Sequence, residues 1–232
     1  MSRKTIYFHH SALLFALMLV LLVAVAALIF FGLVSIAFAN VGFTPFTILL
    51  LLVGTLVGSF INIPLLKIRT ITPVIREEQV NWYGVSFKIP QLECGQTTTV
   101  VAINIGGALI PTLVSIYLLS KSSISLIILS LTGVLAVALV THIVAKPVKG
   151  VGIATPAFIP PIAAAVAAFI LAPSEPRTIA YVAGTLGTLI GADLLNLRKI
   201  PKLGAPMASI GGAGTFDGVF LTGIIAVLLT RL

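Results

Sequence analysis

Charged residues are scarce in this chain of 232 residues, and acidic ones are the scarcest. Asp, Glu, Lys and Arg make up 9% of the sequence, and only six residues are acidic. An ordinary soluble domain has roughly 25% charged residues. Hydrophobic residues make up 59% of the chain. This composition excludes an independent soluble domain and indicates an integral membrane protein.

Cysteine is nearly absent as well. The single cysteine, Cys94, lies in a polar stretch and has no partner for an internal disulfide. One cysteine carries no metal-binding pattern, and the few Asp, Glu and His residues make a cage of several carboxylates hard to build. We therefore expect no cofactor and no metal.

Long apolar runs, in contrast, are abundant, and several reach the ~18–20 residues that span a bilayer as a helix. They are continuous rather than alternating, which favours helices over a transmembrane β-barrel. The sequence predicts an all-α fold: a polytopic transmembrane bundle forming a single domain. The expected helices cover residues 11–39, 45–66, 99–119, 122–145, 156–172, 178–197 and 215–232. The first run is too long for a signal-peptide core, so we expect it to be retained.

The basic residues give this bundle an orientation. With the N-terminus in the cytoplasm, 11 of the 14 Lys and Arg residues fall on the inner side. The three on the outer side are Lys121, Arg177 and Arg231. This asymmetry follows the positive-inside rule and predicts a cytoplasmic N-terminus and an outer C-terminus in a prokaryotic plasma membrane. The net charge of +8 then indicates contact with anionic lipid, not a nucleic-acid partner.

The one sizeable loop is predicted at residues 67–98, on the cytoplasmic side. Its stretch VNWYGVSFKIP alternates in part, which is typical of a β-hairpin turning near Tyr83 and Gly84. The alternative is a loop on the membrane surface with its aromatic residues among the lipid headgroups.

Both aspartates of the chain, Asp193 and Asp217, fall within the last two predicted helices. These helices run in opposite directions, so both carboxylates lie at a similar depth on the cytoplasmic side. A carboxylate facing lipid costs a few kcal/mol. Asp193 therefore faces protein, water or a partner. Asp217, close to a helix N-terminus, is also favoured by the helix dipole.

Other polar residues of the predicted helices fall in the same cytoplasmic layer. They are Asn62, Asn104, His142 and Asn196, the last on the same helix face as Asp193. One interpretation is a shared polar cavity that contains both aspartates. The other is a set of unrelated residues near helix ends, where polar groups are cheaper to place.

Two irregular segments enter the same layer. GVGIATPAFIPP, residues 150–161, contains Pro156 and two further prolines, which disfavour regular helix. SIGGAGTFDG, residues 209–218, places Gly212 and Gly214 just before Asp217. Irregular backbone at membrane depth is typical of segments that line a cavity. Helix packing and a turn explain the glycines equally well.

The stretches GTLIGADLLNL and SIGGAGTFDGVFLTGIIAVLL resemble a prokaryotic membrane family, domain of unknown function 1614. This resemblance extends over essentially the whole chain. It implies a multi-pass membrane protein and no particular activity.

The same residues distantly resemble presenilin-like and prepilin-peptidase-like intramembrane aspartyl proteases, which carry one aspartate on each of two nearby helices. In those proteins the second aspartate closes a Gly-x-Gly-Asp motif, whereas two extra residues precede Asp217 here. The resemblance implies that Asp193 and Asp217 form a catalytic dyad. It also implies that Gly212, Gly214 and Pro156 shape a groove for transmembrane peptide substrates.

Three functions remain open from the sequence. In a protease, one ionised carboxylate activates water while the protonated one polarises the peptide carbonyl. In a transporter, the aspartates bind a proton, Na⁺ or a small cation, with Asn62, Asn104 and His142 completing the site. In a structural or accessory protein, the aspartates cap helices or pair with nearby cations, namely Arg198, Lys199 or Lys202.

Overall fold

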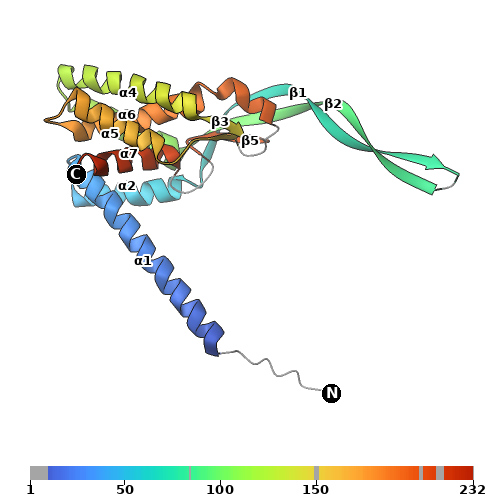
Figure 1. Cartoon of the computed structure of the whole chain (residues 1–232), viewed down its shortest axis with the longest axis horizontal. Coiled ribbons are helices and arrows are strands. Elements are labelled where there is room, and N and C mark those ends of the chain that lie inside the picture. The colour runs from blue at the N-terminus through green and yellow to red at the C-terminus, as the bar shows by residue number, and fades with distance from the viewer. Residues whose placement is uncertain (1–9, 84, 149–151, 204–205, 213–216, 232) are drawn as a thin grey trace.

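A computed structural model describes residues 10–83, 85–148, 152–203, 206–212 and 217–231 (Figure 1). Its α-helices are α1 (His10–Asn40), α2 (Pro45–Gly58), α3 (Ile110–Ser120), α4 (Ile124–Val144), α5 (Ile159–Leu171), α6 (Pro176–Thr188) and α7 (Gly218–Leu229). Its strands are β1 (Asn62–Trp82), β2 (Val85–Asn104), β3 (Lys146–Val148), β4 (Gly152–Ala154) and β5 (Met207–Ile210). Shorter helices are the π-helices η1 (Ile105–Leu109) and η2 (Leu189–Leu194) and the 3₁₀-helix η3 (Leu197–Leu203). The chain is mostly helical, as predicted, and its strands correct the all-α class.

Helix α6 is the centre of the bundle. It packs against α3, α4, α5 and α7, and Figure 1 shows these helices side by side. Every residue from Ile179 to Thr185 is buried. Glycines bring its backbone close to its neighbours: a Cβ added to Gly187 would lie 2.7 Å from the Cβ of Val137 on α4. Proline in the first turn of α2, α3, α5 and α6 marks where these helices begin, since that turn needs no N–H donor.

Helix α1 lies largely outside this bundle and extends away from it in Figure 1. Its leucines, such as Leu21 and Leu28, are exposed along most of its length. Only its C-terminal end is packed, where the Phe38 ring lies 5.9 Å from the Tyr181 ring and 6.2 Å from the Phe220 ring. Two helices, α1 and α4, are long and apolar enough to cross a membrane.

Of the two alternatives for residues 67–98, the structure has the β-hairpin, which is longer than expected. Strands β1 and β2 pair antiparallel from Asn62 opposite Asn104 to Trp82 opposite Val85. The chain turns at Tyr83, whose φ of 50° lies in the left-handed region. The hairpin therefore includes the end predicted for the second helix and the start predicted for the third. Short apolar runs do not separate strand from helix by periodicity, and residues 97–103, TTTVVAI, are rich in β-branched side chains.

The irregular elements gather at one end of the bundle. Strand β5 pairs parallel to β2, with Val100 opposite Met207 and Ile103 opposite Ile210. Strands β3 and β4 form a small separate hairpin. Figure 1 shows β3 and β5 at the end of the helices from which the long hairpin emerges. This end carries the candidate site.

Candidate functional site

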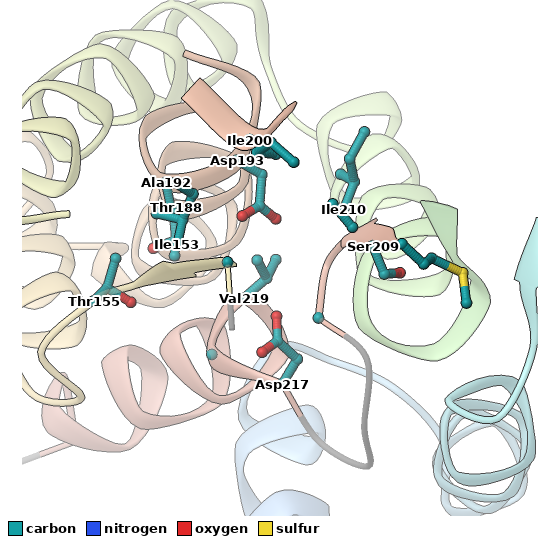
Figure 2. Close-up of a pocket in the computed structure, with 15 residues that line it drawn as sticks. Ile153, Thr155, Thr188, Ala192, Asp193, Ile200, Ser209, Ile210, Asp217 and Val219 are labelled. Atoms are coloured by element: carbon teal, nitrogen blue, oxygen red, sulfur yellow. The ribbon is translucent and has the colours of Figure 1, made fainter. Parts of the chain in front are cut away.

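A cavity of about 130 Å³ lies at this end of the bundle. It is lined by β4, the end of α6 with η2, β5 and the start of α7. Asp193 and Asp217 both line it, and Figure 2 shows their carboxyl groups pointing into the same space from opposite sides, with Val219 between them. We call this cavity the aspartate pocket.

Asp193 is carried by the π-helix η2, which continues α6. The sequence predicted a regular helix here, ending at residue 197. A π-helix has i→i+5 hydrogen bonds, so residues five apart lie on one face. Thr188 and Asp193 accordingly line the pocket together. Gly191 lets η2 approach α4, because a Cβ at this position would overlap the carbonyl oxygen of Ala138.

The Asp193 carboxylate is held by the backbone of the β5 segment. Its Oδ2 accepts a hydrogen bond from the N–H of Gly211 at 2.7 Å. A hydrogen bond to a charged acceptor is stronger than a neutral one. Within the described residues Asp193 forms no ion pair with Arg198 or Lys199, and the side chain of Lys202 lies outside them.

Asp217 precedes α7 instead of lying one turn inside a helix, as the sequence had predicted. It is the N-cap residue, with extended φ and ψ of −63° and 165°. Its carboxylate lies near the N–H groups of Gly218 and Val219, although no side-chain capping hydrogen bond meets the required geometry. The helix dipole favours a negative charge at this position, as predicted.

Two glycines bring the backbone against Asp217. Gly211 and Gly212 have φ angles of 78° and 79°, a region that side chains disfavour. A Cβ on Gly212 would overlap the Asp217 carboxylate, and one on Gly107 of η1 would overlap the carbonyl oxygen of Gly211. Gly212 lines the pocket, as expected of a residue that shapes it. Gly214 lies outside the described residues.

Asn62 and Asn104 are joined to the pocket through Ser209. They are paired residues at the base of the hairpin, and Asn104 Nδ2 donates to Asn62 Oδ1 at 3.1 Å. Asn104 is also the N-cap residue of η1, so its predicted place at a helix start is confirmed, whereas Asn62 lies in a strand. Asn104 also donates to the carbonyl of Ser59 and accepts from the N–H of Gly107. Ser209, which lines the pocket, donates to Asn62 Oδ1 at 2.5 Å. Asn62 and Asn104 therefore hold strand β5 in place without lining the pocket themselves.

His142 and Asn196 form a second polar cluster that does not line the pocket. Asn196 Nδ2 donates to the carbonyls of Gly191 and Ala192 and lies 3.3 Å from His142 Nδ1. The expectation that Asn196 shares the face of Asp193 is wrong, because the π-helix changes which residues align. Asn196 instead supports the η2 backbone just before Asp193.

Pro156 does not line the pocket. It is exposed between β4 and α5, and α5 begins at Ile159, three residues later than predicted. Its neighbours Gly152, Ile153 and Thr155 line the cavity instead. The segment thus reaches the pocket through strand β4.

Thr188 and Ser209 are pocket residues that the sequence did not reveal. Their signal is weak, because single hydroxyl residues are common in apolar runs. The i, i+5 spacing of Thr188 and Asp193 becomes informative only once a π-helix is assumed. The pocket thus offers two carboxylates and three hydroxyls, those of Thr155, Thr188 and Ser209. The described residues contain no group of three His, Cys, Asp or Glu side chains placed to hold a metal ion.

The comparisons with known proteins give one result. The model of a family described as "Protein of unknown function (DUF1614)" matches residues 56–229, a range that includes every pocket residue named above. No curated protein and no solved structure matches the chain. The predicted family resemblance is confirmed, and the resemblance to aspartyl proteases stays a prediction.

Proposed function

The chain belongs to the DUF1614 family. We propose that this protein is a membrane-embedded hydrolase that resembles aspartyl proteases. Asp193 and Asp217 form its catalytic pair. The observation that supports this most directly is their placement. The two carboxyl groups face one cavity from two helical segments, one where α6 with η2 ends and the other where α7 begins.

The chemistry needs one carboxylate ionised and the other protonated, and close carboxylates favour this state. The ionised carboxylate takes a proton from a water molecule while the oxygen of that water bonds to the peptide carbonyl carbon. The protonated carboxyl donates to the carbonyl oxygen. The C–N bond then breaks as the leaving nitrogen takes a proton from the first carboxyl group, and one hydroxyl of the intermediate returns a proton to the second carboxylate, which leaves the carboxylic acid product.

The substrate in this proposal is an extended peptide from an unwound transmembrane segment. Strand β5 is at the edge of the three-stranded sheet among the described residues, and its residues Met207 to Ile210 line the pocket. An edge strand offers free N–H and C=O groups to a further strand. A peptide paired with β5 would pass beside both aspartates.

The membrane placement is also part of the proposal. Helices α1 and α4 cross the bilayer, and the shorter apolar helices lie with α6 in the same bundle, namely α2, η1 with α3, α5 and α7. Around the pocket the chain forms strands β4 and β5 and the π-helix η2 instead of regular α-helix. Irregular backbone is tolerated at membrane depth where it lines a cavity. The orientation with the pocket near the cytoplasm follows from the basic residues.

A photoaffinity probe tests the catalytic pair without knowledge of the natural substrate. The probe is an apolar peptide with a hydroxyl-bearing isostere of the tetrahedral intermediate, since such analogues bind far more tightly than substrates. We expect labelling of the purified full chain to fall at least tenfold in Asp193→Asn and in Asp217→Asn. The matched control is Glu175→Gln, an acidic residue outside the pocket. Equal labelling in all four proteins would overturn the proposal.

A further inference from the structure

Helix α6 carries a file of hydroxyl groups that leads away from the aspartate pocket. Its members are Thr178, Tyr181, Thr185 and Thr188, at spacings of three, four and three residues. Such spacings place side chains on one helix face. At about 1.5 Å rise per residue the file is about 15 Å long, and neighbouring members are about 4.5–6 Å apart along the axis.

The inner three members are buried hydroxyl groups. Tyr181, Thr185 and Thr188 are 1%, 0% and 2% exposed. Among the described residues the Thr188 hydroxyl has no hydrogen-bond partner, and the Tyr181 and Thr185 hydroxyls interact with each other without a well-aligned hydrogen bond. Buried hydroxyls are nearly always satisfied, usually by the carbonyl one turn earlier. A file of such groups on one face of one helix points to a function.

The neighbouring helix α7 packs its backbone directly against this file. A Cβ on Gly223 of α7 would overlap the Thr185 hydroxyl and would lie 3.3 Å from the Tyr181 ring. The file therefore lies at the interface of α6 with α7, the two helices that carry the aspartates. Glycine at this position keeps the Thr185 hydroxyl free of a covering side chain.

Each end of the file opens into a cavity. Thr188 lines the aspartate pocket. Thr178 lines a second cavity of about 410 Å³, at the other end of α6, together with Glu175, Arg177 and Asn40. The amide nitrogen of Asn40 is buried and also lacks a partner among the described residues. A polar route thus joins a cavity with one carboxylate to a cavity with two.

We propose that this hydroxyl file conducts protons between the far cavity and the aspartate pair. A hydroxyl accepts a proton on its oxygen as it releases its own, so each member of the file can pass a proton to the next. The proton passes from Glu175 and water in the far cavity along Thr178, Tyr181, Thr185 and Thr188. It ends on the carboxylate of Asp193 or Asp217, so the pair exchanges protons with the side of the membrane predicted to be outer.

Proton flux into vesicles tests this route independently of hydrolysis. The full chain is reconstituted in liposomes that contain a pH-sensitive dye, and a potassium gradient with valinomycin drives protons inward. We expect flux several-fold above protein-free vesicles, and at least fivefold lower flux in Thr185→Val and Thr188→Val. Thr185→Ser keeps the hydroxyl and should restore most of the flux. The matched control is Ser115→Ala, which removes a buried hydroxyl that is satisfied by the carbonyl of Pro111.

The outcomes separate this route from the hydrolase. If Thr185→Val loses flux but keeps full labelling by the photoaffinity probe, the file conducts protons and the pocket is intact. If the wild type shows no flux above empty vesicles, the proposal is overturned, whatever the labelling shows. It is also overturned if Thr185→Val and Ser115→Ala conduct equally.

Discussion

Helices α1 and α6 are opposites in composition and in position. Helix α1 is apolar along most of its length, yet most of its side chains are exposed. Helix α6 carries hydroxyls and leads to Asp193, yet it is the most enclosed helix of the bundle. A water-soluble protein has the reverse arrangement. The difference is what the proposed placement of α1 in a lipid bilayer predicts.

Residues of α1 and of α6 are constrained in different ways. Along α1, up to its packed C-terminal end, the residues need only be apolar, because no close neighbour restricts their shape. Along α6 each residue meets a neighbouring helix, a cavity or another polar group. Sequence changes should therefore be tolerated on α1 and specific in effect around α6.

The largest contrast is expected from the same substitution at two glycines. Gly187→Val on α6 places branched carbons where a Cβ alone would lie 2.7 Å from Val137. Overpacking of this kind costs about 1–3 kcal/mol or more. Gly32→Val on α1 meets nothing within 4 Å. Thermal unfolding in detergent should show a fall of several degrees in Tm for Gly187→Val and little change for Gly32→Val. Equal Tm values would show that α6 is not closely packed.

A second contrast concerns two glycines with positive φ. Gly212 and Gly42 have φ angles of 79° and 99°, so alanine strains the backbone at both positions. Only at Gly212 would the added Cβ also overlap the Asp217 carboxylate, since nothing lies within 4 Å at Gly42. We expect Gly212→Ala to reduce photoaffinity labelling about tenfold, which corresponds to about 1.4 kcal/mol, and Gly42→Ala to change it less than twofold. Equal loss in both variants would mean that backbone strain alone disturbs the pocket.

The sequence predicted the parts of the fold that depend on composition. Helix α1, helix α4, the hairpin turn at Tyr83 and the shared location of Asp193 and Asp217 all follow from apolar runs and turn residues. The ends of the hairpin did not follow, because Asn62 and Asn104 lie in apolar stretches that suit a helix as well as a strand. Only pairing between the two strands decides between these structures.

The pocket was less predictable than the aspartates that line it. A helical wheel assumes regular helix, so it grouped Asn196 with Asp193 and missed Thr188. The π-helix forms where Gly191 packs on α4, a tertiary contact that no local pattern reports. Similarly, Ser209 reaches the pocket because β5 pairs with β2, more than 100 residues earlier in the chain.

The smallest expected change is in the free energy of unfolding when a buried hydroxyl is removed. This change also distinguishes a functional role from a packing role for the hydroxyl on α6. Thr185→Val replaces a buried hydroxyl, which interacts with the Tyr181 hydroxyl without a well-aligned hydrogen bond, with a methyl group of similar size. We expect this change to be neutral or stabilising by about 1 kcal/mol. On α1, Ser35→Ala removes a hydroxyl that donates to the carbonyl of Phe31 at 2.8 Å, and we expect a loss of about 0.5 kcal/mol or less. Chemical unfolding in detergent would measure both changes. If Thr185→Val loses more stability than Ser35→Ala, the hydroxyl is a structural group with a partner. If it is as stable as the wild type or more so, α6 retains this hydroxyl against its own stability, which is typical of residues kept for function.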